Sequence, residues 1–332
     1  MHHFIFKSVR ASIFLALALI FTSAQAAQLD LMPDDYVVKP DTVQLAFNLL
    51  QRRQIGAYVN GSLPQNSVRI SPFLPAIPLA KTVIESQVAS IRLSKFMTLG
   101  EFTVAPVLVA SYRNIENTSS SYSALVDMQK ILGEGAQGVH GDIGVGGTLW
   151  LVNQPAKHEF LGVTAFMTLP TGDYDARKNI NLSENRWRFV LSGGWVTTLG
   201  DKWVNEFSPE IAWYGDNNAY RDFTQSRYIL NTQLKGTDEL SQEKTYALSD
   251  TLRYKITPSI HVFSMAQINR GGKTYVNNSK LSDAADNTRI ALGLLFYTQG
   301  GNQWMLRYQK DTAIENGLRL ADEVTLRYMH YF

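Results

Sequence analysis

The C-terminal residues 323–332, EVTLRYMHYF, change character at every second position. One alternate set is apolar or aromatic except for His330, and comprises Val324, Leu326, Tyr328, His330 and Phe332. The other set is mostly polar. Because successive side chains of a strand point to opposite faces, this alternation predicts a strand with one apolar face. The last ten residues are therefore expected to form a strand whose apolar face is buried against protein or lipid.

This ending, with its C-terminal Phe332, resembles the closing strand of bacterial outer-membrane barrels. The resemblance implies that the barrel-assembly machinery is a partner, through the C-terminal strand. His330 departs from the signature, which usually has an aromatic or aliphatic residue at that position. An edge strand of a soluble sheet shows the same alternation, so the rest of the chain has to decide between the two.

The N-terminus has the three parts of a secretory signal peptide. Lys7 and Arg10 form a basic start, residues 11–21 are apolar, and residues 24–26 (AQA) form a small-x-small cleavage site. We expect cleavage after Ala26, which makes residues 1–26 the signal peptide. The apolar run is too short for an ordinary membrane-spanning helix. No Cys follows the cleavage site, which excludes a lipoprotein.

The composition suits a membrane barrel better than a helical membrane protein. Mean hydropathy is only -0.13, yet aromatic residues reach 11% and there is no Cys. A transmembrane barrel explains both values, because only alternate residues face lipid. Removing Lys7 and Arg10 from the 31 basic residues leaves 29, which equals the 29 acidic residues. This balance gives no indication of nucleic-acid binding.

Alternating segments and turn residues predict about twelve strands and an all-β fold. Their expected ranges are 42–60 (bent at 51–54), 81–97, 101–112, 141–153, 159–169, 185–199, 203–214, 245–256, 259–270, 287–298, 303–310 and 323–332. The connections alternate between long and short, as periplasmic turns and extracellular loops do in outer-membrane barrels. We therefore expect a transmembrane antiparallel up-and-down β-barrel over 42–332. Residues 27–41 are expected to form a periplasmic lead-in or a plug.

Charged side chains fall on the inward phase of these strands. They are Arg186, Arg188, Glu206, Glu210, Arg253, Lys255, Arg289, Arg307, Glu323 and Arg327. They either pair across neighbouring strands and fill the lumen, or line a path that favours anions or polarises an aromatic solute. Apolar residues such as Trp150, Phe263 and Met265 share the inward phase. Asp250 falls on the outward phase, which indicates either a bulge or a wrong phase at that point.

Four short segments carry a family resemblance: 141–144 (GDIG), 168–175 (TLPTGDYD), 181–187 (NLSENRW) and 213–217 (WYGDN). In this order they resemble the family described as "Putative MetA-pathway of phenol degradation". Membership implies an outer-membrane barrel that passes hydrophobic or aromatic compounds.

The motif residues of the loop after strand 159–169 have two readings. They are Pro170, Gly172, Asp173, Asp175, Asn185 and Trp187. Proline, glycine and aspartate at these positions favour loop architecture over direct ligand contact. The Asp173–Asp175 spacing lacks the rest of a calcium loop, so no metal site is expected.

The expected function is passive uptake of small hydrophobic or aromatic compounds through the outer membrane, with membrane lipids and these solutes as partners. A structural or receptor barrel without transport is the alternative. A membrane lipid hydrolase would need a His that activates a Ser. Neither His140 (HGD) nor His261 (HVFS) has the His-x-Ser-Asn pattern of such enzymes. We therefore expect no catalysis and no cofactor.

Overall fold

The computed structural model describes residues 41–58, 61, 67–68, 77–78, 80–81, 83–118, 120–121, 135–138, 141–178, 180–221, 237–298 and 302–332. The expected signal peptide and residues 27–40 of the expected lead-in lie outside these ranges. In the described part of the chain, no helix has the length and apolar character needed to cross a membrane. A single turn of 3-10 helix, η3 (Pro155–Lys157), joins two strands.

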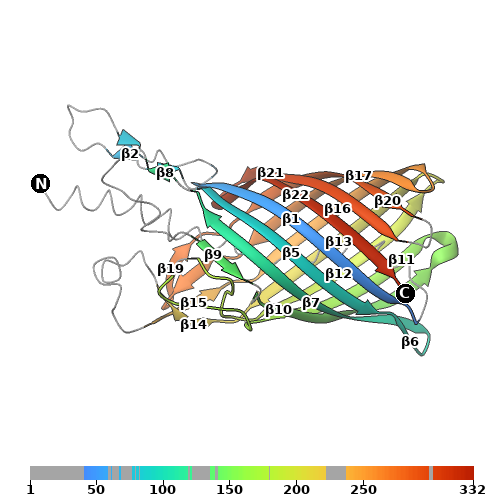
Figure 1. Ribbon diagram of the computed structural model, residues 1–332, viewed down its shortest axis with the longest axis horizontal. Helices are drawn as coiled ribbons and strands as arrows, with labels where there is room; N and C mark the ends of the chain where they lie inside the picture. Colours follow the sequence, from blue (N-terminus) through green and yellow to red (C-terminus); the bar gives the residue numbers. More distant parts are fainter. Residues whose placement is uncertain are drawn as a thin grey trace, which may run out of the picture.

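Twelve long strands form a closed antiparallel barrel (Figure 1). In their order around the wall they are β1 (Val43–Tyr58), β5 (Val83–Lys95), β7 (Phe102–Asn117), β10 (Ile143–Gln154), β11 (Glu159–Leu169), β12 (Arg188–Leu199), β13 (Trp203–Tyr214), β16 (Thr245–Thr257), β17 (Ile260–Gly271), β20 (Asn287–Tyr297), β21 (Gln303–Ile314) and β22 (Gly317–Tyr331). The wall closes where β22 pairs with β1. The expected all-β barrel of twelve strands is confirmed.

The two ends of the barrel differ. Short turns, β6 (Met97–Leu99) and the C-terminus lie at one end, which we call the turn end (Figure 1). The other end, the loop end, carries a separate four-stranded sheet of β14 (Asn217–Tyr220), β15 (Asp238–Gln242), β18 (Thr274–Val276) and β19 (Ser279–Ser282). The sequence had indicated only loops there. Short pairs β2 (Ser67–Val68) with β3 (Ile77–Pro78) and β4 (Ala80–Lys81) with β8 (Ser120–Ser121), and β9 (Gly135–Gly138) on β7, complete the sheets.

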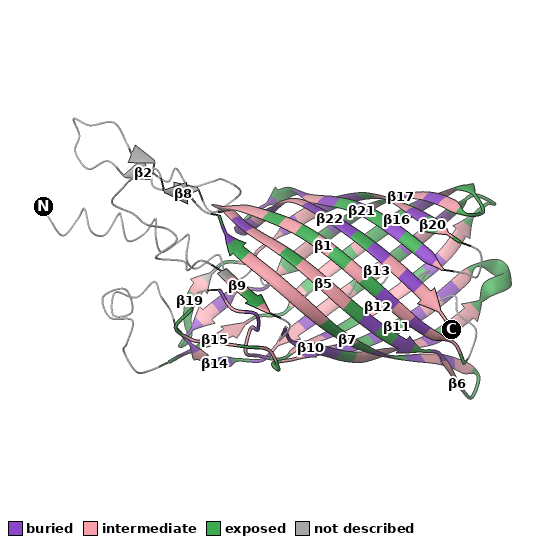
Figure 2. Cartoon of the chain, viewed as in Figure 1, coloured by how far each residue is buried: buried purple, intermediate pink, exposed green. Residues whose placement is uncertain are grey.

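Exposure alternates along the barrel strands, as the sequence pattern requires (Figure 2). The outward set is apolar and strongly exposed, for example Leu49, Leu93 and Leu292. Aromatic pairs flank this set, with Trp203 against Tyr254 near the turn end, at 4.7 Å between ring centroids. Such a belt with aromatic borders is the surface that a bilayer covers, so the barrel is a transmembrane one.

The last hairpin corrects the expected alternation of long and short connections. Residues 311–320 were expected to be a loop, but β21 and β22 continue almost to Asn316. The side chain of Asp311 holds the two strands together, because its Oδ2 accepts a hydrogen bond from Leu320 N at 2.8 Å. The polar residues of this segment therefore serve a buried hydrogen-bonded network, which sequence periodicity does not distinguish from a loop.

Two further details of register differ from expectation. The bend expected at 51–54 is a shift in the pairing of β1 with β22 between Arg53 and Gln54, while β1 itself continues to Tyr58. Asp250 lies in unbroken register with Phe207 on β13 and faces outward. Neither a bulge nor a wrong phase explains it, so this carboxylate belongs to the outer face.

Candidate functional site in the barrel interior

Arg253 and Glu206 form an ion pair inside the barrel, between β16 and β13. Their side chains are 2% and 1% exposed, and Nη2 of Arg253 lies 3.4 Å from Oε1 of Glu206. Arg253 also donates from Nη1 to the hydroxyl of Tyr297 at 3.2 Å. Charges buried to this degree require partners, because desolvation costs several kcal/mol per ion. Both residues thus lie where the inward phase of their strands places them.

Glu323 on β22 is shared by two arginines. Its Oε2 lies 2.6 Å from Nη2 of Arg52, and its Oε1 lies 3.4 Å from Nη2 of Arg307. Gln309 donates to the same Oε1 at 2.5 Å. One carboxylate on β22 therefore binds two guanidinium groups, one from the strand on each side of it.

A second network lies on β20 and β21. Nε of Arg289 donates to Oδ1 of Asp311 at 2.8 Å, and Asn287 donates to the same oxygen at 3.0 Å. Arg327, on β22, donates to Oε1 of Gln303 at 3.3 Å. All these side chains are buried. The interior along β20, β21, β22 and β1 is therefore a hydrogen-bonded wall rich in guanidinium, which we call the charged wall.

Of the two expected lumen-lining arginines nearest the loop end, only Arg188 lies in a strand, although both Arg186 and Arg188 were expected to. Arg188 on β12 lies 3.4 Å from Glu210 on β13. Arg186, expected within a strand, precedes β12 and is fixed by Glu184 at 2.8 Å and by Gln242 at 2.5 Å. It therefore belongs to the rim, and the predicted set of lumen-lining charges is divided between the rim and the wall.

The inward face of β7, β10, β11, β12 and β13 carries apolar clusters beside the charges of Arg188, Glu206 and Glu210, and we call it the apolar wall. Val107, Phe166, Val190 and Ala212 form one buried cluster on it. The ring of Phe166 lies over Gly144, where a Cβ would collide with it. Glycine is therefore required there, because the aromatic ring covers the bare backbone.

Aromatic side chains meet across the interior at the turn end. Phe96, Trp150 and Phe160 belong to one buried cluster, and Tyr331 from the far side of the barrel packs against it. We call these four residues the aromatic layer. Because it joins opposite sides of the wall, it narrows the interior at the turn end.

The family-motif loop binds mainly to itself and to the rim. Asp142 accepts hydrogen bonds from the backbone of Gly172 at 3.0 Å and of Glu184 at 3.4 Å. Asn185 donates to Asn217 at 2.9 Å.

The other motif residues have similar local contacts. The carbonyl of Asp173 accepts from Ser183, Asp175 binds Arg177, and the carbonyl of Trp187 accepts from Gly215. Pro170 is exposed at the start of the loop. These contacts agree with a role in loop architecture.

The Asp175 carboxylate accepts hydrogen bonds from Arg177, and this contact lowers the pKa of Asp175 to about 2.

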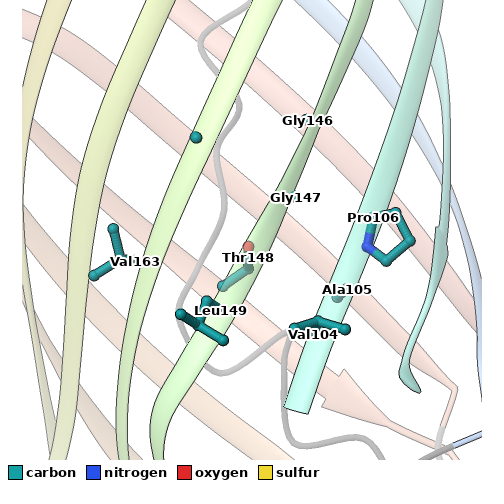
Figure 3. A pocket seen from close by; sticks show the side chains of 9 residues that line it. Val104, Ala105, Pro106, Gly146, Gly147, Thr148, Leu149 and Val163 are labelled. Carbon is teal, nitrogen blue, oxygen red and sulfur yellow. The ribbon is translucent and has the colours of Figure 1, made fainter. Parts of the chain in front are cut away.

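A groove of about 410 Å³ lies on the opposite, outer face of the apolar wall (Figure 3). Its floor is made by small outward residues of adjoining strands, Pro106, Gly147 and Ala165, with Val104 and Val163 beside them. This hollow faces the bilayer and not the lumen, since its floor residues carry the outward phase of their strands. It is therefore separate from the interior described above.

The sequence matches the family model "Putative MetA-pathway of phenol degradation" over residues 79–327. The chain belongs to this family. No curated protein matches it by sequence. Among solved structures, an outer membrane channel from Pseudomonas putida F1 is similar with a TM-score of 0.72 at 23% identity, covering 90% of this chain and 99% of that one. The transport unit of the autotransporter AIDA-I from Escherichia coli has a TM-score of 0.51 at 9% identity, covering 97% of each chain. The shared feature is the barrel fold.

Several interior residues were missed by sequence reasoning. Arg52 fell in the expected bend at 51–54, although the alternation of β1 places it inward. Asp311 fell in the expected loop. Phe96 directly follows β5 and keeps the inward phase of Arg92 and Ser94, within the expected strand 81–97, but it was not singled out. His261, by contrast, has the inward phase that its strand pattern predicts, and it is buried beside Tyr297 with ring centroids 4.9 Å apart.

Proposed function

We propose that the protein is an outer-membrane channel for passive uptake of small hydrophobic or aromatic compounds. The observation that carries this proposal is the interior itself. A barrel with a lipid-facing apolar belt encloses an apolar wall, a charged wall and an aromatic layer. An interior that combines rings, aliphatic groups and hydrogen-bond donors offers a desolvated route for solutes that have a ring and a polar group.

Family membership supports the same proposal, because the family is named for phenol degradation. The similar Pseudomonas putida structure is described as an outer membrane channel. In this proposal the turn end faces the periplasm, the loop end faces outward, and lipids contact the belt. The signal peptide is removed after Ala26. Mass spectrometry of the membrane-fractionated protein tests placement, and an intact N-terminus or inner-membrane recovery contradicts it.

A structural barrel is the second candidate, and the buried ion pairs favour it. Two buried ion pairs fill space in the interior as well as placing charge there: Arg253 with Glu206, and Arg289 with Asp311. Cells that lack the protein distinguish the two candidates. A channel predicts slower uptake of aromatic compounds at low concentration, with little change for sugars. A structural barrel predicts equal uptake of both classes.

A further inference from the structure

A second hollow, of about 370 Å³, lies on the outer face of the barrel near the loop end, and we call it the outer pocket. Its size is that of a site for a small molecule or a lipid headgroup. Unlike the apolar groove of Figure 3, it is lined by two arginines, two carboxylates and two hydroxyls: Arg270, Arg319, Asp286, Glu315, Thr288 and Thr312.

The outer pocket lies at the border of the lipid-facing belt. On β17 the outward series passes from Ile268 to Arg270, and on β20 it passes from Ile290 to Thr288. Both isoleucines are exposed members of the belt. One outward position further toward the loop end, the side chains are polar. In a transmembrane barrel this change marks the boundary between hydrocarbon and headgroups. The outer pocket therefore lies at the level of lipid headgroups.

Both arginines keep donors for a ligand. Within the described ranges, the Arg319 side chain makes one hydrogen bond, from Nε to the carbonyl oxygen of Asp311 at 3.1 Å, so its two Nη atoms remain. Arg270 uses Nη1 for the carbonyl oxygens of Asn269 and Asn287, at 2.9 and 3.5 Å, which leaves Nη2. The Arg270 side chain is 53% exposed. Guanidinium groups with accessible donors suit the oxygens of a phosphate.

The two carboxylates of the outer pocket differ in their contacts. Oδ1 of Asp286 accepts a hydrogen bond from Gly271 N at 2.9 Å, and Oδ2 lies 4.0 Å from Nε of Arg270. Asp286 therefore offsets part of the charge of Arg270. Glu315 is exposed at the hairpin between β21 and β22. Among the residues that the structure describes, neither Glu315 nor Arg319 has an ion-pair partner, so Arg319 is the cation most available to an anionic ligand.

We propose that the outer pocket binds a phosphate group of an outer-leaflet glycolipid, the phosphorylated glucosamine of lipid A. The phosphate binds Arg319 and Nη2 of Arg270, while the acyl chains lie against the belt. A lipid gains from both contacts at once, whereas free phosphate has only the arginine contacts, so the pocket favours the lipid. The inference depends on the orientation proposed above, with the loop end outward, and it is independent of transport.

Native mass spectrometry of the folded, full-length chain in detergent tests the inference, because it resolves single bound lipid molecules. The probes are lipid A with both phosphates and the same lipid after their removal, with a chelator present to exclude bridging cations. We expect the phosphorylated lipid to bind at least about tenfold more tightly. Equal affinities overturn the proposal. Displacement of lipid A by millimolar inorganic phosphate overturns the lipid as the ligand.

Three variants locate the binding. Arg319→Gln should weaken lipid A about tenfold and leave the dephosphorylated lipid unchanged. Arg53→Gln is the matched control, because Arg53 is also exposed on the outer face but pairs with Asp322 at 2.6 Å, outside the outer pocket.

Glu315→Gln removes a negative charge beside the phosphate and should strengthen lipid A about threefold. This exposed position keeps the test valid if Arg319→Gln does not fold, as judged by the electrophoretic shift on heating. Equal lipid A affinity in Arg319→Gln and Arg53→Gln overturns the proposal, as does weaker binding in Glu315→Gln.

Discussion

Asn205 donates a hydrogen bond from Nδ2 to Oδ1 of Asp250 at 2.8 Å, on the outer face of the barrel. Asp250 lies midway between Tyr246 and Tyr254 on the same face of β16. A carboxylate in the middle of the lipid-facing belt is unfavourable, and one amide partner offsets only part of that cost.

Replacing this carboxylate should stabilise the barrel. We expect Asp250→Leu to raise the free energy of unfolding by on the order of 1 kcal/mol, measured by urea titration in lipid vesicles. Asp322→Leu is the control, because Asp322 pairs with Arg53 near the loop end. A loss of stability in Asp250→Leu instead indicates that the carboxylate has a partner in the membrane.

The Arg253–Glu206 pair should show strong coupling. Arg253→Met leaves Glu206 as a buried charge without this arginine, so we expect a loss of about 3 kcal/mol in the free energy of unfolding. Arg253→Met combined with Glu206→Met should recover most of the loss. A double-mutant cycle measures this, and additive losses argue against a coupled pair.

Asp142 should control the order of the motif loop. Asp142→Ala removes the acceptor of two backbone N–H groups, a loss of roughly 1–3 kcal/mol if they stay buried. We expect faster tryptic cleavage after Arg177 and Lys178 while the barrel remains folded. Glu159→Ala, at the turn end, is the control and should leave the cleavage rate unchanged.

The Asp175–Arg177 contact predicts a pH dependence of the same loop. The folded pKa of Asp175 is about 2, below its ordinary value of 3.8. A depressed folded pKa gives a contribution to stability that is complete above the ordinary pKa and is lost as pH falls toward 2. Carbon NMR of Asp175 should therefore titrate near 2, and Arg177→Ala should move the pKa upward. An unchanged titration in Arg177→Ala refutes the assigned cause.

Barrel closure depends on the C-terminal strand. Phe332 N donates to Val43 O at 2.9 Å, and Gln44 pairs with Tyr331. Deleting residues 328–332 should abolish assembly and the electrophoretic shift between heated and unheated samples. An insertion between Asn277 and Asn278 should preserve that shift, although Asn277 bonds Asp238 in the loop-end sheet. Normal assembly after the deletion contradicts the closure.

Strand periodicity was enough to predict the barrel, because a lipid-facing belt imposes alternation on every strand. Strand periodicity gave wrong or ambiguous predictions where a residue was polar for a reason other than facing water. The polar residues around Asp311 form a buried network, and Asp250 is polar on the outer face. The pairing of Glu323 with Arg52 joins residues from opposite ends of the chain. The register between β22 and β1 determines which arginines reach the Glu323 carboxylate. That register cannot be derived from the alternation pattern of a single sequence.

Blocking the interior is the most direct test of transport. The chain has no Cys, so one introduced thiol is labelled selectively. Thr164 faces the interior at 7% exposure, whereas its neighbour Val163 faces lipid at 36%. Thr164→Cys and Val163→Cys are labelled with the same bulky thiol reagent in vesicles with a lipopolysaccharide outer leaflet, and initial uptake of radiolabelled benzoate and phenol is measured. The account predicts that the label abolishes protein-dependent uptake in Thr164→Cys and leaves it intact in Val163→Cys. Equal uptake in labelled and unlabelled Thr164→Cys, or in vesicles with and without the protein, contradicts passage through the barrel.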